Sequence, residues 1–144
     1  ETLKARLGIA VITPHPRELS RLSGQSVTEI QESRIATVRR LSQEWNVVLL
    51  LKGAFTVIGS PDARIFINPT GNSALSTAGS GDVLSGFIGA FLAQGLSPLN
   101  ATLTGAFLHG LAADCFVEQH DSSYMVASDL FEGLRLARNS IKLH

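Results

Sequence analysis

Apolar positions along the chain form two continuous runs and several helical stripes. The runs IAVIT (residues 9–13) and VVLLLKG (residues 47–53) have the length of strands, and continuous runs are typical of strands buried on both faces of a parallel sheet. Between them, Ser26 and Glu29 form a predicted capping box. It opens a single amphipathic helix, expected over residues 26–46, whose apolar stripe consists of Ile30, Ile35, Val38, Leu41 and Trp45.

The remaining elements alternate in the order expected of an α/β architecture with a mostly parallel sheet. They are a helix over residues 16–24, a β-hairpin of strands 55–60 and 64–70, and helices from 82 to about 94, over 97–120 with Ser97 as cap, and over 127–143. A parallel sheet must be covered on both faces. Because the strands are few for these helices, and because the chain lacks an initiator Met, we expect it to begin inside a domain.

Composition narrows the function classes. Lys and Arg together number 12, as do Asp and Glu, so there is no basic surface for nucleic acid or for an anionic membrane. The 144 residues contain no apolar run of about 18 residues, the length that a membrane span needs. Cys115 is the single cysteine, which excludes an intrachain disulfide and favours the reducing cytoplasm.

The segment AGSGD (residues 78–82) places a glycine turn directly before an apolar helix. Gly79 and Gly81 allow a ligand to approach the main chain, and the start of a helix offers unpaired N–H groups and the positive end of its dipole. Such a turn can bind a phosphate or a developing oxyanion. Asp82 would repel a resident phosphate unless it acts as a base that takes a proton from an attacking hydroxyl. The alternative is that Asp82 caps the helix.

Three further side chains follow predicted strands. Lys52 is a candidate phosphate ligand, or a surface lysine whose stem packs on apolar neighbours. His15, between two prolines, is a candidate substrate contact, and Glu18 is a candidate for holding a metal-bound water. Their alternatives are a solvent-facing histidine and a glutamate that stabilises the first turn of a helix. His109 and Cys115 show no metal-ligand spacing and are expected to be packing residues.

Five motifs in sequence resemble one family. They are TPHPRE (13–18), LLKGAFTVI (50–58), NPTGN (68–72), AGSGDVLSG (78–86) and FLHGLAAD (107–114), and together they look like the ADP-dependent NAD(P)H-hydrate dehydratases of the ribokinase-like superfamily. The similarity runs from about Ile9 to the last helix. It implies a ribokinase-like three-layer α/β/α fold with a mostly parallel sheet and a hairpin, of which residues 1–144 form the C-terminal portion of a single domain.

The resemblance also implies an activity and its residues. These enzymes repair hydrated NADH and NADPH: the hydroxyl of the S epimer is phosphorylated, by ADP in bacteria and by ATP in eukaryotes, and phosphate is then eliminated. Mg²⁺ and ADP or ATP are therefore expected. The matching positions are Asp82 as catalytic base and substrate contact, His15 as a second substrate contact, Lys52, Gly53, Ala54, Phe55, Thr56 and Gly81 for the nucleotide, Ala78, Gly79, Ser80 and Gly81 for the anion hole, and Glu18 for an indirect contact to Mg²⁺.

The chain departs from the family pattern at three positions. Phe55 and Arg17 stand where these enzymes often have Gly, and Ser80 replaces a common Thr. Family members are nearly twice as long, so the N-terminal half of the domain is not in this sequence. The partners implied are the NAD(P)H hydrate and the nucleotide, further copies in a homo-oligomer, the N-terminal half as another chain, and an upstream epimerase domain. Neither nucleic acid nor a membrane is expected.

Two other functions fit part of the pattern. A related small-molecule kinase, acting on a vitamin precursor, would use the same anion hole and base but release a stable phosphorylated product. A non-catalytic nucleotide-binding fragment would keep the segment around Lys52 and lack part of the substrate pocket. The segments Lys-Gly-Ala-Phe-Thr and Asn-Pro-Thr-Gly-Asn favour the dehydratase.

Overall fold

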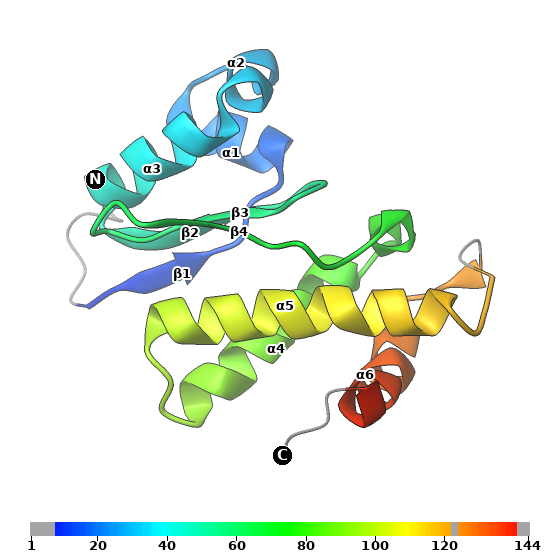
Figure 1. The fold of residues 1–144 in the computed structure, drawn as a ribbon. Coiled ribbons are helices and arrows are strands. Elements are labelled where there is room, and N and C mark those ends of the chain that lie inside the picture. Colours follow the sequence, from blue (N-terminus) through cyan, green and yellow to red (C-terminus); the bar gives the residue numbers. More distant parts are fainter. Residues whose placement is uncertain (1–7, 122–123, 141–144) are drawn as a thin grey trace. The chain divides into compact units, whose positions relative to one another are not determined.

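The computed structural model describes residues 8–121 and 124–140 (Figure 1). The chain divides into two compact units. The first contains the residues up to Asn68 together with Ser97–Thr102, and the second contains Pro69–Leu96 and the residues from Leu103 onward. Over the described part of the chain, no helix combines the length and the apolar character that crossing a bilayer requires.

The first unit contains a four-stranded sheet in the order β1-β2-β3-β4, with strands β1 (Ala10–Ile12), β2 (Val47–Leu51), β3 (Val57–Gly59) and β4 (Ile65–Ile67). Strand β1 pairs with β2 in parallel, and β3 is antiparallel to both of its neighbours. The expected strands and the hairpin are therefore confirmed. Within the described strands the sheet is mixed rather than mostly parallel, because the link from β2 to β3 is too short for a crossover and returns the chain antiparallel.

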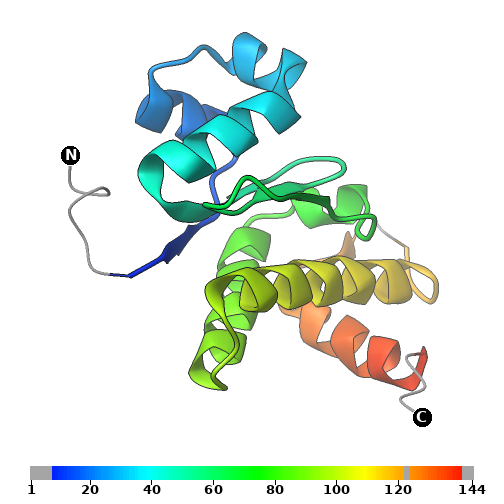
Figure 2. The ribbon, with the colours of Figure 1, turned by 60° about the vertical axis from the view of Figure 1, so that its left-hand side comes forward.

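Helices α1 (Pro16–Ser23), α2 (Val27–Glu32) and α3 (Arg34–Trp45) cover one face of this sheet (Figures 1 and 2). Helix α1 ends at Gly24, as expected. The capping box at Ser26 is also confirmed: Ser26 Oγ accepts from the Glu29 amide at 3.2 Å, and Glu29 Oε2 accepts from the Ser26 amide at 2.8 Å.

The expectation of one helix over residues 26–46 is wrong. Ser33 adopts φ −131° and ψ 39°, which separates α2 from α3. The break resets the helical phase, so residues spaced for one continuous stripe no longer share a face. Ile35 is consequently 42% exposed, although Ile30 and the other members of the expected stripe are buried.

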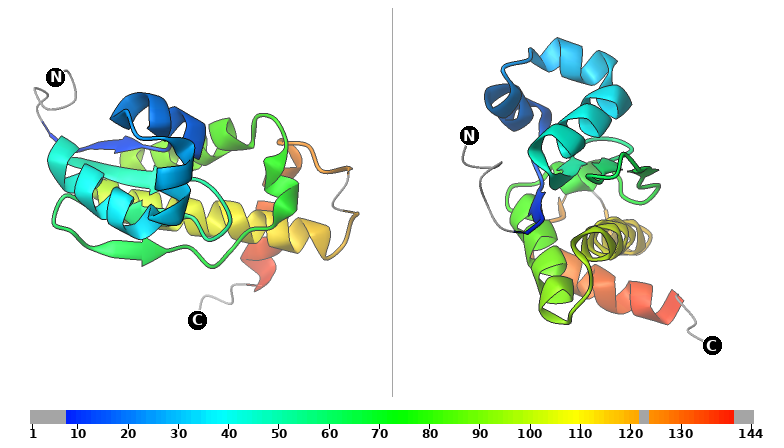
Figure 3. Two further views of the ribbon diagram at one scale, coloured as in Figure 1. Left: turned by 90° about the horizontal axis from the view of Figure 1, so that it is seen from above. Right: turned by 90° about the vertical axis from the view of Figure 1, so that its left-hand side faces the viewer.

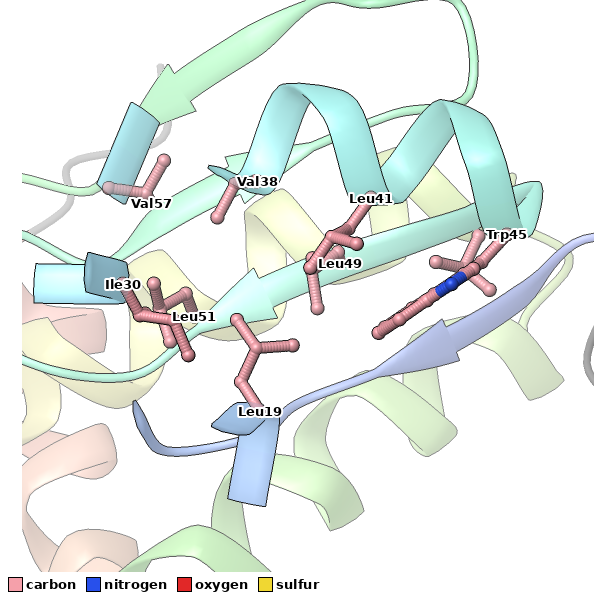
Figure 4. Packing of buried hydrophobic residues seen from close by; sticks show 9 residues of the cluster. Leu19, Ile30, Val38, Leu41, Trp45, Leu49, Leu51 and Val57 are labelled. Carbon is pink, nitrogen blue, oxygen red and sulfur yellow. The ribbon is translucent and has the colours of Figure 1, made fainter. Parts of the chain in front are cut away.

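The core of this unit lies between the helices and β2. Figure 4 shows Leu49 and Leu51 of β2 facing Val38 and Leu41 of α3, with Trp45 at the far end of the helix. All five residues of β2 are buried, including those on the opposite side of the strand. The continuous apolar run thus marks a strand buried on both faces, as its pattern predicted.

The second unit contains a short 3₁₀ helix, η1 (Ser73–Ser76), and the helices α4 (Ser80–Ala93), α5 (Pro98–Val117) and α6 (Asp129–Ser140), with the first residues of α5 belonging to the first unit. Figure 3 (right) shows α5 along its axis with α4 and α6 beside it. Helix α6 approaches α5 closely at Gly133, where a Cβ atom would collide with the backbone of Ala112.

The helices predicted for this region are confirmed with shifted ends. Helix α4 begins two residues earlier than expected, at Ser80, and α6 begins at Asp129, while residues 141–143 of the expected last helix lie outside the described residues. Ser97 Oγ accepts from the Asn100 amide at 3.3 Å, which confirms Ser97 as the cap of α5. His109 and Cys115 are buried, at 7% and 6% exposure, as expected of packing residues.

Candidate active site

The carboxyl ends of β1 and β2 bring His15, Glu18 and Lys52 together. The Lys52 amide donates to the carbonyl of Pro14 at 3.0 Å, which carries the parallel pairing one step beyond the strands. Glu18 opens helix α1 directly after β1, and its Oε2 lies 3.7 Å from Lys52 Nζ. The Lys52 side chain is 30% exposed. This lysine is therefore partly buried and paired with Glu18 at the strand end rather than free on the surface.

His15 and Glu18 form a capping box at the start of α1. His15 Nδ1 accepts from the Glu18 amide at 3.1 Å, and Glu18 Oε2 accepts from the His15 amide at 2.7 Å. That hydrogen bond from the His15 backbone lowers the pKa of the Glu18 carboxyl, and the charge of Lys52 lowers it further. The structure thus shows Glu18 in its helix-stabilising role, in the first turn of α1.

The residues described do not form a direct metal site. No group of three or more His, Cys, Asp or Glu side chains able to hold a metal ion occurs within residues 8–121 and 124–140. The one acidic side chain at the strand ends, Glu18, already faces Lys52 Nζ and, at 3.5 Å, His15 Nε2. A magnesium ion prefers one or two carboxylates together with water and nucleotide phosphates, and Glu18 is the carboxylate that lies at this strand end.

Arg34 fixes the end of β2 and was not predicted from the sequence. It begins α3 immediately after the break at Ser33. Its Nη2 lies 3.3 Å from the carbonyl oxygen of Leu51 and 3.5 Å from that of Lys52, and its Nη1 donates to Gln31 Oε1 at 2.8 Å. Burial lowers the pKa of the Arg34 guanidinium. The guanidinium thus joins the start of α3 to the end of β2.

The segment Gly53–Thr56 forms a tight loop between β2 and β3. Gly53 has φ +140°, a backbone conformation that favours glycine, and a Cβ atom there would lie 2.9 Å from Arg34 Nη1, so a larger residue would also displace the guanidinium. Thr56 Oγ1 donates to the Gly53 carbonyl at 3.1 Å, and the Asn68 amide donates to the Thr56 carbonyl at 2.9 Å. Phe55, at the tip, has φ 53° and is 73% exposed. The loop is thus held at both ends with an aromatic side chain outside.

The glycine turn in the second unit ends with unpaired amides. Gly79 is the N-cap of α4, with φ 85° and no side-chain cap. Within the described residues, the N–H groups of Gly79 and Gly81 donate to no protein acceptor, whereas the amides of Asp82 and Val83 both bond to the Gly79 carbonyl. Asp82 lies in the first turn and is exposed. The helix cap is therefore Gly79, and the Asp82 carboxylate is left available beside two unpaired donors.

Two contacts hold this turn in place. Ser80 Oγ donates to the Leu75 carbonyl at 2.7 Å, and the Ser80 carbonyl lies 2.9 Å from His109 Nε2. Burial lowers the pKa of His109, and the hydrogen bond to Ser80 opposes that shift. The neutral imidazole with its proton on Nε2 donates to the Ser80 carbonyl in this arrangement.

The NPTGN segment is anchored to α5 by side-chain hydrogen bonds. Asp114 accepts from the Gly71 amide at 2.8 Å and from Asn72 Nδ2 at 2.9 Å. Asn72 Oδ1 in turn accepts from the Ala74 amide at 3.0 Å and so caps η1. Thr70 Oγ1 donates to the Phe107 carbonyl at 2.9 Å. These bonds use residues of two sequence motifs that lie some 40 positions apart.

The expected site residues therefore form two sets. His15, Glu18 and the segment Lys52–Thr56 belong to the first unit, and the turn of residues 78–81 with Asp82 belongs to the second. The first set offers the Lys52 ammonium and an exposed aromatic ring at a strand end, where α/β folds bind ligands. The second offers backbone donors for an anion and a carboxylate that can take a proton.

Comparison with known proteins decides the family. Residues 2–135 match the sequence profile described as NAD(P)H-hydrate dehydratase. The chain belongs to this family. A bifunctional NAD(P)H-hydrate repair enzyme of Moorella thermoacetica, Nnr, is 49% identical over 127 residues, which make up 88% of this chain and 24% of that protein.

Solved structures agree with this assignment. The ADP/ATP-dependent NAD(P)H-hydrate dehydratase of Bacillus subtilis, co-crystallised with ATP and Mg²⁺, has a TM-score of 0.89 at 35% identity, over 94% of this chain and 49% of that one. A ribokinase-like superfamily protein of Enterococcus faecalis has a TM-score of 0.74 at 29% identity, over 90% of this chain and 44% of that one. The ribokinase-like fold is confirmed. The chain spans at most about half the length of these relatives.

Proposed function

We propose that the chain is the C-terminal part of a dehydratase domain that restores NADH and NADPH from their S hydrates, with ADP as the phosphoryl donor. One observation on this chain supports the proposal most directly. The exposed Asp82 carboxylate lies in the same turn as the amides of Gly79 and Gly81, which have no acceptor among the described residues. A base next to an anion-binding turn suits phosphoryl transfer to a hydroxyl. The family match favours this activity over that of a small-molecule kinase.

In the proposed reaction, Asp82 takes the proton of the substrate hydroxyl as its oxygen attacks the terminal phosphorus of ADP. A new P–O bond forms, and the bond to the AMP leaving group breaks. Residues 78–81 bind the transferred group through their backbone amides. The ring C–O bond then breaks, phosphate leaves with the bonding pair, and loss of a ring proton restores the double bond. The net products are the reduced dinucleotide, AMP and phosphate.

The first unit would bind the nucleotide and part of the substrate. Lys52 supplies a positive charge, and Gly53, Ala54, Phe55 and Thr56 form the loop along the nucleotide, with Gly81 as a further contact. His15 would contact the hydrated nicotinamide. Mg²⁺ would arrive with the phosphates, whose charge it neutralises when bound, and meet Glu18 through water. The pairing of Glu18 with Lys52 supports a role near phosphate, since both side chains already lie at the strand end.

The assembly of the complete protein is also a proposal. Residues 1–144 would form the C-terminal portion of one ribokinase-like domain that includes both units. The N-terminal half would come from the same polypeptide or from another chain, an epimerase domain would precede it, and the whole would form a homo-oligomer. We also propose a cytoplasmic location, which the single cysteine, Cys115, supports as a buried free thiol.

The test uses the full-length protein with the S hydrate of NADH, ADP and Mg²⁺. We expect the absorbance of the dihydronicotinamide to return with release of AMP and phosphate in equal amounts. A stable phosphorylated product would instead identify a small-molecule kinase. Calorimetry with ADP, ATP and AMP tests the remaining alternative, because binding of nucleotide without turnover of the hydrate would identify a non-catalytic module.

A further inference from the structure

Phe55 combines high exposure with a backbone conformation that bulky side chains rarely adopt. It is 73% exposed and has φ 53°, in the left-handed region. Two other non-glycine residues of the described chain have positive φ, Asn46 and Ala63. Asn46 ends helix α3, where this conformation is common, and Ala63 lies in the turn of the β3–β4 hairpin. Phe55 also lies in a loop between antiparallel strands, β2 and β3, but unlike Ala63 it carries a bulky aromatic side chain in this conformation.

The neighbours of Phe55 impose its conformation. Thr56 Oγ1 donates to the Gly53 carbonyl, which closes the loop around residues 54 and 55, and the Asn68 amide holds the Thr56 carbonyl. On the other side, the guanidinium of Arg34 lies against Gly53. A glycine at position 55 would fit this backbone without strain. A phenylalanine here disfavours folding for two reasons: its backbone conformation is strained, and its apolar ring is exposed to solvent. We therefore expect the side chain to have a function.

We propose that the ring of Phe55 is the platform on which the base of the bound nucleotide stacks. This inference rests on the proposed function, since it concerns the same nucleotide site. An uncharged aromatic face suits the flat face of a base, which every nucleobase offers. Lys52, three positions earlier at the same strand end, offers a cation for the phosphates. The loop thus presents separate groups for the two chemically different ends of one nucleotide.

The test compares four forms of the full-length protein: unmodified, Phe55→Gly, Phe55→Trp and Ala63→Gly. Calorimetry measures the dissociation constants of ADP and of inorganic pyrophosphate, which lacks a base, and thermal unfolding measures the melting temperature. Phe55→Gly should weaken ADP binding by about 5- to 150-fold, the effect of losing one base–aromatic stack. It should leave pyrophosphate binding unchanged and should not lower the melting temperature, because the backbone strain is relieved. Phe55→Trp should keep ADP binding.

Ala63→Gly relieves a left-handed residue elsewhere in the same unit and serves as the matched control. It should leave both dissociation constants unchanged. Unchanged ADP binding in Phe55→Gly, or equal weakening of ADP and pyrophosphate, would overturn the stacking role and leave the proposed function intact. No ADP binding by the unmodified protein would overturn the proposed function, and the stacking role with it.

Discussion

The Nε2 atom of His109 lies 2.9 Å from the carbonyl oxygen of Ser80, the first residue of helix α4. This buried contact links the middle of α5 to the turn that precedes Asp82. His109 is therefore more than a packing residue, because its imidazole also orients the backbone of the expected anion hole. A substitution of His109 that keeps a hydrogen-bond donor at this position should preserve the turn. Because the imidazole titrates, the stability of the protein should depend on pH.

The stability of the protein should fall as the pH is lowered from about 7 to 5. Burial lowers the pKa of His109 in the folded state, so the unfolded chain takes up this proton first, near pH 6.5. The free energy of unfolding then rises with pH across this window, by up to about 1.4 kcal/mol per unit for one proton. Urea unfolding at several pH values should show a flatter dependence in His109→Gln.

The acidic groups do not obscure this effect. Glu18, Glu29 and Asp62 have lowered pKa values in the folded state, so their contributions are lost only as the pH falls below about 4.5. An identical pH dependence in the unmodified protein and in His109→Gln, between pH 5 and 7, would show that His109 does not carry it.

Asp82→Asn should strongly reduce turnover while keeping nucleotide binding. The amide cannot accept the hydroxyl proton, so we expect kcat for the S hydrate of NADH to fall by about 10²–10⁴-fold. The dissociation constant of ADP should change little or improve, because a negative charge near the phosphates is removed. Glu118→Gln removes an exposed carboxylate directly after α5 and should keep full activity. Near-normal turnover by Asp82→Asn would contradict the assignment of the base.

Arg34→Met should loosen the loop between β2 and β3. The substitution removes the donors that face the carbonyl oxygens of Leu51 and Lys52 but keeps most of the apolar stem. We expect a loss of about 1 kcal/mol in the free energy of unfolding by urea, together with weaker ADP binding. Arg39→Met, at an exposed position of the same helix, is the control. If Arg34→Met and Arg39→Met change stability and ADP binding equally, Arg34 does not position the loop.

Asn72 and Asp114 should be exchangeable as a pair but not singly. Asp114→Asn leaves one acceptor oxygen for two donors, the Gly71 amide and Asn72 Nδ2, and Asn72→Asp brings two carboxylates together. Each single change should cost about 1–3 kcal/mol of unfolding free energy. In the double variant, the side-chain amide introduced at position 114 can accept from the Gly71 amide and donate to the carboxylate introduced at position 72, so the stability should largely return. A double-mutant cycle without coupling would exclude this contact in solution.

The spacing of apolar residues predicted most helices and strands, because each element buries one face and that face is visible in the local sequence. The run at β2 is buried throughout, and the capping boxes and the Gly24 stop are formed by neighbours in sequence. The prediction failed at Ser33, where no Gly or Pro signals a break and Ile35 completes an apparent stripe. A pattern of apolar spacings cannot report a change of helical phase when each half remains amphipathic.

The sequence by itself determined the family, the strands and helices, and the glycine turn before Asp82, since these depend on residue type and short-range spacing. Tertiary structure alone decided that Arg34 fixes the end of β2, that Asp114 anchors Asn72 and that His109 contacts Ser80. The physical reason is that such contacts join residues 17 to 42 positions apart. Their hydrogen-bonding partners are chosen by the packing of whole elements, which local sequence does not encode.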